Sequence, residues 1–428
     1  MADRVVTVAN DVIIDGAVDI DEQGLIADVG PETALGPPPP DRRVIGGVLM
    51  PGLVNTHAHT PMTLVRSVGD GLPLQQWLTD AVWPREGVMN PDDARVGMML
   101  GSAEMLLAGV TTSCEMYLFE EQVVEAVAHT GGRLVMTPGI IAALHGDSFG
   151  TGGGRADAVA EFARRHHDPA GLVTVGVGPH STYDLTPAQI GDLAALAGDL
   201  GTFVHVHLEE TSVEHQRVID QHGKPATELL ADHGVFDVPV LAAHGVWLSD
   251  SDRAILSAAG AAIAHNPVSN LKLGSGIMDL RATLDAGIRV GLGTDGPASN
   301  DNLSLWQELA LAPMLARAKH HDAGAVDAAT ALELATSSGA AALGLPVGRL
   351  EPGAPADIVR LDSDHPTLAP GLDEELITTI VFSGGPHVVT DVWVQGRHVV
   401  DDRTLTTVDL EPLVADAKIR AQRLADDS

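Results

Sequence analysis

The middle of this chain repeats one pattern, in which a short apolar segment is followed by a segment rich in Ala and Leu. The apolar segments recur eight times, at residues 48–59, 109–116, 133–140, 173–181, 202–210, 239–245, 261–270 and 289–296. Intervening stretches such as 92–107, 187–200 and 212–233 have helical texture. Eight strand–helix units predict an α/β fold, a (β/α)8 barrel of the TIM type over residues 51–345. An open doubly wound sheet is the alternative, but no G-x-G-x-x-G motif opens the first unit.

Both ends of the chain have a different texture, with short strand-like segments separated by turn residues. These segments are 4–9, 11–21, 25–30 and 42–50 at the start and 356–362, 377–384 and 388–400 near the end. A proline-rich connector, residues 37–40, precedes the last of the first group. We expect residues 1–50 and 346–407 to form one small β-sandwich domain, and residues 408–428 to form a C-terminal helix.

The charge of the chain limits its partners. A formal charge of −33, from 58 acidic and 25 basic residues, repels nucleic acid and anionic membranes, and no run of Lys and Arg offers them a binding site. The single cysteine, Cys114, excludes an intrachain disulfide and fits a reducing compartment. No signal peptide and no membrane-spanning apolar run is found. We therefore expect a cytoplasmic protein with a small-molecule substrate, and leave open whether it is a homo-oligomer.

Polar residues cluster at the carboxyl ends of the expected strands, where barrels of this type place their active sites. A single histidine on a strand is more often a hydrogen-bonded core residue than a ligand. Here most of the eight strands end in such a residue, which weakens that interpretation. His205 shares the alternation phase of His207, and we place it one layer deeper as a structural group. The residues at the strand ends are His57, His59, His180, His207, Glu210, His244, His265 and Asp295.

A metal site is the simplest use of this set. His57 and His59 lie two apart on a strand, so both imidazoles point inward and can share one ion. His207 and Asp295 complete a set of three nitrogens and one carboxylate, which suits Zn²⁺, with Fe²⁺, Ni²⁺ and Mn²⁺ as alternatives. Because Lys224 is the first lysine in the chain, no lysine on the fourth strand could bridge a second metal. We expect one divalent metal per chain, which would lower the pKa of a bound water toward neutrality.

Six motifs resemble, in order and spacing, the amidohydrolase superfamily: PGLVNTHAHTPM (51–62), GPHSTY (178–183), VHVHLEET (204–211), AAHGVWL (242–248), HNPVSNLKLGSG (265–276) and GTDGPASNDNLSLW (293–306). More narrowly, they resemble the 5′-methylthioadenosine/S-adenosylhomocysteine deaminase branch, whose relatives include the triazine hydrolases. The resemblance covers nearly the whole chain. It implies hydrolytic deamination of an adenosine-type nucleoside to the inosine analogue and ammonia.

The resemblance also implies roles for individual residues. The metal ligands of the family fall on His57, His59, His207 and Asp295. The acid/base glutamate falls on Glu210, which would also touch the substrate, take a proton from the water and deliver it to the purine ring. His244 would hold the attacking hydroxide in line. Asp295 would bind metal and accept a proton on the way to ammonia release.

Three further residues match substrate contacts of the branch. Glu86 and His180 match positions that bind ribose hydroxyls. Arg155 matches one of two arginines that hold the carboxylate of S-adenosylhomocysteine, but Pro138 stands at the other position. This departure favours a neutral 5′ group, as in methylthioadenosine, adenosine or 5′-deoxyadenosine. The glycine-rich run at residues 150–154 lacks the Lys-Ser/Thr of a phosphate loop, and we expect a lid there.

Other functions are weighed against the deaminase. A hydrolase of a substituted triazine or guanine-like ring is the alternative on the same scaffold, although a triazine has no ribose for Glu86 and His180 to bind. A non-catalytic binding protein would have no need of four ligands together with Glu210 and His244. A cyclic amidase usually uses the bridged two-metal site that the lysine positions exclude.

Overall fold

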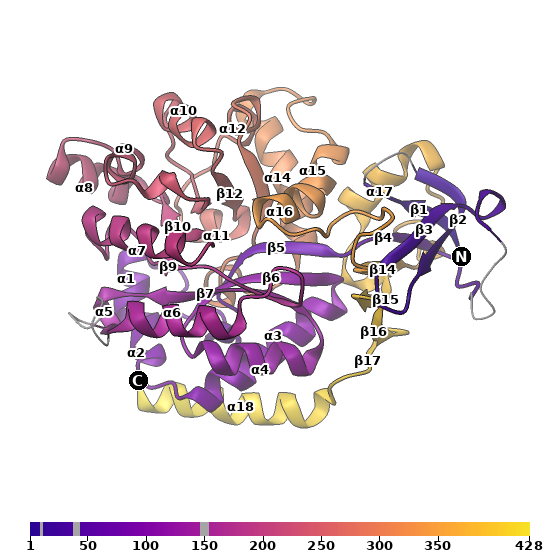
Figure 1. Cartoon of the computed structure of the whole chain (residues 1–428), viewed down its shortest axis with the longest axis horizontal. Helices are drawn as coiled ribbons and strands as arrows, with labels where there is room; N and C mark the ends of the chain where they lie inside the picture. Colours follow the sequence, from indigo (N-terminus) through magenta and orange to yellow (C-terminus); the bar gives the residue numbers. More distant parts are fainter. Residues whose placement is uncertain (9–11, 37–42, 146–153) are drawn as a thin grey trace.

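A computed structural model of the chain describes residues 1–8, 12–36, 43–145 and 154–428. The proline-rich connector at 37–40 and most of the expected lid, at 150–153, lie outside the described residues. A barrel of strands surrounded by helices forms one part of the molecule, and a sheet made of both chain ends forms the other (Figure 1). The expected barrel and a separate sheet built from both chain ends are confirmed.

The described barrel strands run parallel and follow chain order: β5 (Leu53–Ala58), β6 (Val110–Tyr117), β7 (Arg133–Ile140), β8 (Val173–Val175) with β9 (Gly178–Pro179), β10 (Val204–Leu208), β11 (Val240–His244), β12 (Ala262–His265) and β13 (Arg289–Leu292). Hydrogen bonding divides them into a half with β5 to β9 and a half with β10 to β13. Isolated parallel bridges close the two seams, at Ala58 with Asp295 and at Ser181 with His207. The strands are buried along almost their whole length, as parallel strands covered by helices must be.

Helices cover the outside of the barrel. Several begin at a side-chain cap, such as Asn90 with Asp93 before α3 and Thr186 with Gln189 before α7, which satisfies the free N–H groups of the first turn. The longer helices are α3 (Pro91–Leu107), α4 (Glu120–Thr130), α6 (Arg155–His166), α7 (Pro187–Asp199), α8 (Ser212–His222), α9 (Ala226–Asp232), α10 (Asp250–Ala258), α14 (Leu305–His320) and α15 (Ala328–Leu334).

Shorter helical turns lie near the carboxyl ends of the strands or join larger elements. Three consecutive turns, α1 (Leu74–Trp77), the π-helical η3 (Leu78–Val82) and α2 (Trp83–Glu86), contribute to the cavity described below. The others are η2 (Thr60–Val65), α5 (Ala142–His145), η5 (Val235–Asp237), α11 (Pro267–Lys272), α12 (Leu280–Asp285), α13 (Pro297–Asn300) and α16 (Ser337–Ala342). None of the helices in the described ranges combines the length and apolarity needed to cross a membrane.

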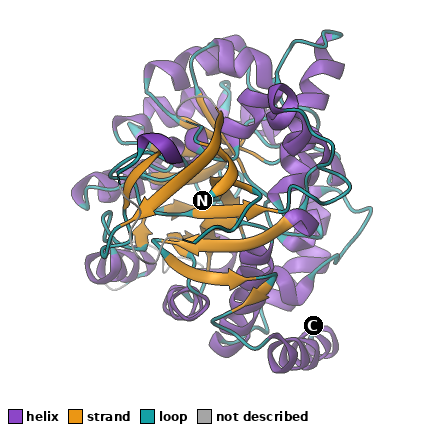
Figure 2. Cartoon of the chain, turned by 90° about the vertical axis from the view of Figure 1, so that its right-hand side faces the viewer, coloured by secondary structure: helices purple, strands orange, loops and turns teal. Residues whose placement is uncertain are grey.

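The terminal domain is one hydrogen-bonded sheet with the order β17-β16-β15-β14-β4-β1-β2-β3. Strand β4 pairs with β1 on one side and with β14 on the other, so the two ends of the chain meet there. Figure 2 shows this sheet facing the viewer, with barrel helices behind it. The strands are β1 (Ala2–Val6), β2 (Val12–Ile20), β3 (Ile26–Pro31), β4 (Val48–Pro51), β14 (Ile358–Leu361), β15 (Val389–Val394), β16 (Arg397–Asp401) and β17 (Thr404–Leu405), with short turns η1 (Glu32–Ala34), η6 (Asp373–Glu375) and η7 (Pro386–Val388).

One expected strand is wrong. Residues 377–383 of the expected strand at 377–384 are part of α17 (Leu376–Ser383), whose buried side chains Leu376, Ile380 and Val381 have helical spacing and pack toward α14 and α15. A short apolar run rich in β-branched residues does not distinguish a strand from a buried helix, and packing decides. The last helix, α18 (Leu410–Asp427), lies along α3 (Figure 1), where Arg420 and Arg423 both pair with the buried carboxylate of Asp93.

A buried ion pair joins the barrel to the terminal sheet. Arg133 begins β7, and its Nε and Nη2 lie 3.0 and 3.2 Å from the two carboxylate oxygens of Asp357. Both side chains are almost fully buried, at 3% and 1% exposure. The backbone N–H of Gln395 also donates to Asp357, at 2.7 Å, and Arg133 donates to the carbonyl oxygen of Gly171, at 2.7 Å. Each charge therefore has several partners and little contact with water.

Replacing Asp357 should destabilise the fold strongly. Asp357→Ala leaves the Arg133 guanidinium buried without its counter-charge, a change that costs about 3–5 kcal/mol in comparable pairs. Urea unfolding followed by circular dichroism measures the free energy of unfolding. Asp232→Ala is the matched control, since its partner Lys224 is exposed and the midpoint should hardly move. A loss below about 1 kcal/mol for Asp357→Ala would contradict this role of the pair.

Candidate active site

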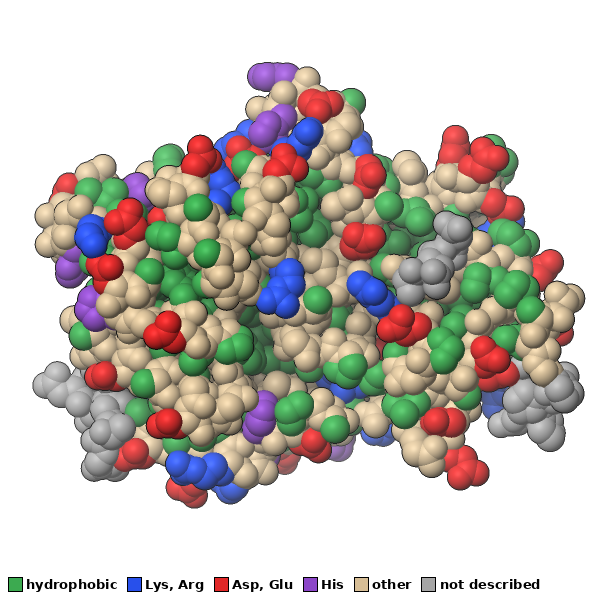
Figure 3. Space-filling view, turned by 45° about the horizontal axis from the view of Figure 1, so that its top comes forward, with side chains coloured by type: hydrophobic (Ala, Val, Ile, Leu, Met, Phe, Trp, Pro, Cys, Tyr) green, Lys and Arg blue, Asp and Glu red, His purple; other side chains and the backbone are tan. Residues whose placement is uncertain are grey.

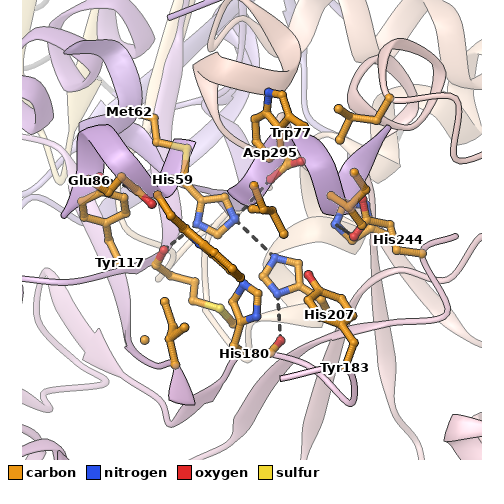
Figure 4. A pocket seen from close by; sticks show the side chains of 18 of the residues that line it. His59, Met62, Trp77, Glu86, Tyr117, His180, Tyr183, His207, His244 and Asp295 are labelled. Carbon is orange, nitrogen blue, oxygen red and sulfur yellow. Dashed lines mark hydrogen bonds and ion pairs between the residues drawn. The ribbon is translucent and has the colours of Figure 1, made fainter. Parts of the chain in front are cut away.

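A cavity opens at the carboxyl ends of the barrel strands and encloses about 620 Å³ including its mouth. Its polar floor comes from the strand ends, and its apolar wall includes Trp77, Leu78 and Trp83 from the turns α1, η3 and α2. Figure 4 shows the polar side chains converging on one point. The predicted site residues that line this cavity are His59, Glu86, His180, His207, Glu210, His244 and Asp295.

Four of the predicted residues meet in one cluster. His57 and His59 come from the end of β5, His207 from β10, and Asp295 from the residues after β13. One ligand atom of each lies within 4.8 Å of those of the other three. Asp295 has a left-handed backbone (φ 60°), fixed by hydrogen bonds from its own N–H and that of Thr294 to the His57 carbonyl oxygen at 2.9 and 3.1 Å. This conformation brings its carboxylate over the histidines.

The hydrogen bonds of two imidazoles define where their lone pairs point. His59 Nδ1 lies 2.6 Å from the carbonyl oxygen of Met116, and His207 Nδ1 lies 2.8 Å from that of His180. A carbonyl oxygen only accepts, so both Nδ1 atoms carry protons. The two Nε2 atoms, 3.3 Å apart, then face each other with their lone pairs unless a cation or an added proton lies between them.

The third imidazole is oriented by a chain of hydrogen bonds below it. The Thr137 hydroxyl donates to the Glu115 carbonyl oxygen at 2.9 Å, so it accepts from His205 Nδ1, also at 2.9 Å. His205 Nε2 is then the acceptor for His57 Nδ1 at 2.9 Å. His57 Nε2 is left as a lone pair, buried, without a hydrogen-bond donor and 3.3 Å from Asp295 Oδ1. His205 thus lies beneath the cluster and positions His57.

The pKa shifts of the cluster favour the presence of one positive charge among its four groups. Burial lowers the pKa of His57 to about 4 and that of His207 well below its ordinary value. Burial opposes ionisation of Asp295, but its contacts with His57 and His59 hold its pKa well below the usual range. Burial also lowers the pKa of His59, yet Asp295 outweighs this and raises it to about 8. Three inward-facing nitrogens and one carboxylate fit a divalent metal such as Zn²⁺.

Two serines that sequence reasoning missed orient the carboxylate. Ser269 Oγ and Ser299 Oγ donate to Asp295 Oδ2 at 2.6 and 2.9 Å, which leaves Oδ1 for the histidines. Oδ1 lies 3.2 Å from His59 Nε2. Both serines occur in motifs that the sequence analysis quoted, but only the fold places them against the same oxygen.

Glu210 and His244 lie beside the cluster. Burial, followed by the charge of Asp295, raises the pKa of Glu210 to about 8, so this carboxyl group holds a proton at neutral pH. His244 Nδ1 lies 2.8 Å from Asn270 Oδ1, an acceptor, so the unprotonated Nε2 is the atom that lies 3.8 Å from Glu210 Oε2. Burial lowers the pKa of His244, which keeps the ring neutral. A proton donor and a neutral acceptor therefore share this side of the cavity.

Glu86 and His180 also line the cavity (Figure 4), with His180 next to His207. Glu86 is buried and accepts a hydrogen bond of 2.6 Å from the hydroxyl of Tyr117, a residue that sequence reasoning missed. Burial raises the pKa of Glu86. Burial also lowers the pKa of His180 to about 3, so this imidazole is neutral, and Tyr183 packs edge-on against it.

Two other predicted residues do not reach the cavity. His265 ends β12 and is buried, but it is not part of the cavity wall. Arg155, at the start of α6, lies in a neighbouring cavity, where it forms a two-point ion pair with Glu120. Pro138, within β7, is buried in the sheet.

The surface carries the negative charge expected from composition. On the face in Figure 3, acidic side chains are spread widely, and the described residues there form no extended patch of Lys and Arg. This distribution agrees with a site that is a deep cavity rather than a basic surface for a polyanion.

The sequence and the fold of the chain are similar to those of known enzymes. The chain is 37% identical over 391 residues to a 5-methylthioadenosine/S-adenosylhomocysteine deaminase of Thermoanaerobacter pseudethanolicus, and the alignment covers 89% of both chains. A crystal structure of an adenosine deaminase from Xanthomonas campestris with bound zinc is similar with a TM-score of 0.90 and 32% identity, covering 99% of this chain and 98% of that chain. An atrazine chlorohydrolase from Arthrobacter aurescens complexed with zinc gives 0.85 and 26%, covering 98% and 100%.

The family itself is matched over most of the sequence. Residues 48–399 match the amidohydrolase family, a span that runs from β4 to β16 and includes the whole barrel. The six motifs that resembled this superfamily all lie within the matched residues. The chain therefore belongs to the amidohydrolase family.

Proposed function

We propose that this protein deaminates an adenosine-type nucleoside by metal-dependent hydrolysis, giving the inosine analogue and ammonia. The observation that carries the proposal is the shared cavity, which combines a cation site, a protonated carboxyl group and a neutral imidazole. The names of the relatives support the same reaction, since they include deaminases of methylthioadenosine and of adenosine. Methylthioadenosine, adenosine and 5′-deoxyadenosine are the proposed substrates, with S-adenosylhomocysteine treated below.

We propose one divalent metal per chain, held by His57, His59, His207 and Asp295. The donor set favours Zn²⁺, with Fe²⁺, Ni²⁺ and Mn²⁺ as alternatives, and two structurally similar proteins contain zinc. When bound, such an ion lowers the pKa of a water enough to make it nucleophilic near neutral pH. The residues of the chain provide the rest of the chemistry.

Glu210 is suited to move the proton that the reaction requires. A neutral adenine ring accepts water at its amino-bearing carbon more readily once the adjacent ring nitrogen is protonated. The buried carboxyl group of Glu210 can give its proton to that nitrogen and then take one from the attacking water. His244 Nε2 can accept a hydrogen bond from the same water and hold it in line. Asp295 can receive the proton of the hydroxyl group that has been added to the carbon and pass it to the amino group, which then leaves as ammonia.

Glu86 and His180 are proposed to bind the ribose. A carboxylate accepts well from two vicinal hydroxyls, and Tyr117 fixes the position of Glu86.

Hydrolysis of a substituted triazine or guanine-like ring is the second candidate, favoured by the similarity to atrazine chlorohydrolase. The charge of −33 and the cavity support a small substrate and no nucleic-acid or membrane partner, and we propose that the enzyme is cytoplasmic.

Removing a metal ligand should remove both metal and activity. His57→Ala and Asp295→Ala each delete one donor, so metal content should fall well below one ion per chain and ammonia release should stop. Elemental analysis of the purified variants measures the content. His265→Ala is the control, because this buried histidine lies outside the cavity wall and its variant should keep its metal. Full activity after exhaustive chelation, with metal absence verified, would exclude the proposed mechanism.

Removing the acid/base function should separate catalysis from metal binding. Glu210→Gln should bind metal normally, while kcat falls by about 10² or more, the usual scale for a lost general acid/base. Glu209→Gln is the matched control, since that carboxylate instead accepts from Ala226 N and His215 and should leave kcat near the wild-type value. If the Glu210 variant keeps more than about a third of the rate, another group carries the proton.

The ribose contacts predict the substrate range. Adenosine, 5′-deoxyadenosine and methylthioadenosine should be deaminated far faster than free adenine or a chlorotriazine, because the ribose orients the ring. Glu86→Ala should lower kcat/KM for the nucleosides by about tenfold to a hundredfold, the value of a lost charge-assisted hydrogen bond. Ammonia release over this panel tests both statements. If adenine reacts as fast as its nucleosides, Glu86 and His180 do not bind the ribose.

A further inference from the structure

A second cavity adjoins the first. Glu86 and Leu118 line both, so a nucleoside whose ribose lies at Glu86 is close enough to the second cavity for its 5′ substituent to reach it. Apolar side chains form part of the wall, namely Met89, Leu118, Phe119 and Leu144. This arrangement gives an uncharged 5′ substituent a wall to pack against.

The charges in this second cavity are unevenly distributed. Among the described residues that line it, three are glutamates (Glu86, Glu120 and Glu121) and one, Arg155, is a cation. Glu121 already has partners on α6, since its two oxygens lie 2.6 Å from Arg165 and 2.9 Å from His166. A substrate carboxylate entering here would meet more negative than positive charge, and Arg155 is the group that could hold it.

Arg155 is, however, occupied within the protein. Its Nη1 and Nη2 donate to the two carboxylate oxygens of Glu120 at 2.8 and 3.0 Å, and its Nε donates to the Gly139 carbonyl oxygen at 3.2 Å. The two side chains are only 13% and 12% exposed, so water screens the pair weakly. Glu120 begins α4 and Arg155 begins α6, and both helices contact β7 (Figure 1). The barrel therefore fixes the positions of the two helices whose first residues form the ion pair.

We propose that Glu120 is a specificity-determining residue, which holds Arg155 in a neutral pair and directs the enzyme to nucleosides whose 5′ substituent lacks a carboxylate. This inference rests on the proposed deamination of adenosine-type nucleosides. A substrate carboxylate must displace Glu120 to gain the guanidinium and must then lie near the displaced charge. A neutral or cationic substituent meets neither obstacle. Glu120 acts through Arg155 and needs no contact with the substrate.

The wild-type holoenzyme provides the first test. S-adenosylhomocysteine is compared with 5′-deoxy-5′-(3-aminopropylthio)adenosine, which lacks only the carboxylate. We expect kcat/KM to be at least about tenfold lower for S-adenosylhomocysteine, the scale of one unfavourable or lost charged contact. Equal or faster turnover of S-adenosylhomocysteine would overturn the inference. Failure to deaminate methylthioadenosine and adenosine as well would instead overturn the proposed function.

Variants then test whether the effect passes through Arg155. E120Q frees the guanidinium and should raise the ratio of kcat/KM for S-adenosylhomocysteine to that for methylthioadenosine by about tenfold. E121Q makes the same charge change on the next residue but leaves the Arg155 pair intact, so it should change the ratio much less than E120Q does. The double variant E120Q/R155M should lose the gain. An unchanged ratio in E120Q, with methylthioadenosine turnover and thermal unfolding near wild type, would overturn the inference. So would an equal gain in E121Q.

Discussion

Three imidazoles and one carboxylate each place one ligand atom within 4.8 Å of the others at the carboxyl end of the barrel. The rest of the site depends on this close grouping of electron-pair donors. A hydrogen bond on its other side orients each of these groups. Backbone carbonyl oxygens orient two imidazoles, His205 orients the third, and two serines orient Asp295. Without a positive charge among them these groups repel one another. Bringing these groups together is therefore electrostatically unfavourable, and a divalent cation bound among them would offset the repulsion.

The position of the cluster also follows from how the barrel closes. The two hydrogen-bonded halves meet at Ala58 with Asp295 and at Ser181 with His207, so metal-site residues stand at both seams. His57 and His59 belong to one half, and His207 and Asp295 belong to the other or follow it. A cation bound by all four would connect the halves, which couples occupation of the site to the integrity of the barrel.

Around the cluster, burial sets the protonation states that catalysis needs. The same loss of water that keeps His244 and His180 neutral keeps a proton on Glu210, because desolvation disfavours every charged form. An uncharged nucleoside can enter such a site without a counter-charge of its own. The Arg155–Glu120 pair extends this character to the neighbouring cavity, since it cancels the guanidinium that an anionic substituent would need.

The sequence by itself determined the periodic features. Eight apolar segments alternating with helical ones are enough to specify a parallel barrel, and the two strand-rich ends specify the separate sheet. Side chains two apart on a strand share a face, and parallel strands end at one rim. For these two reasons the order of residues along the chain places His57, His59, His207 and Asp295 at one rim with four other candidates, and the tertiary structure then brings these four together.

Only the tertiary structure decided the contacts that have no fixed spacing along the chain. Residues 377–383 form a helix because they pack against α14 and α15, although their β-branched composition favours a strand. Tyr117 meets Glu86 across 31 positions, and Ser269 meets Asp295 across 26. Arg155 has the identity expected of a carboxylate-binding residue, yet Glu120, 35 positions away, neutralises it. The sequence specifies which charges exist, but the packing of one helix against another determines which of them remain available to a substrate.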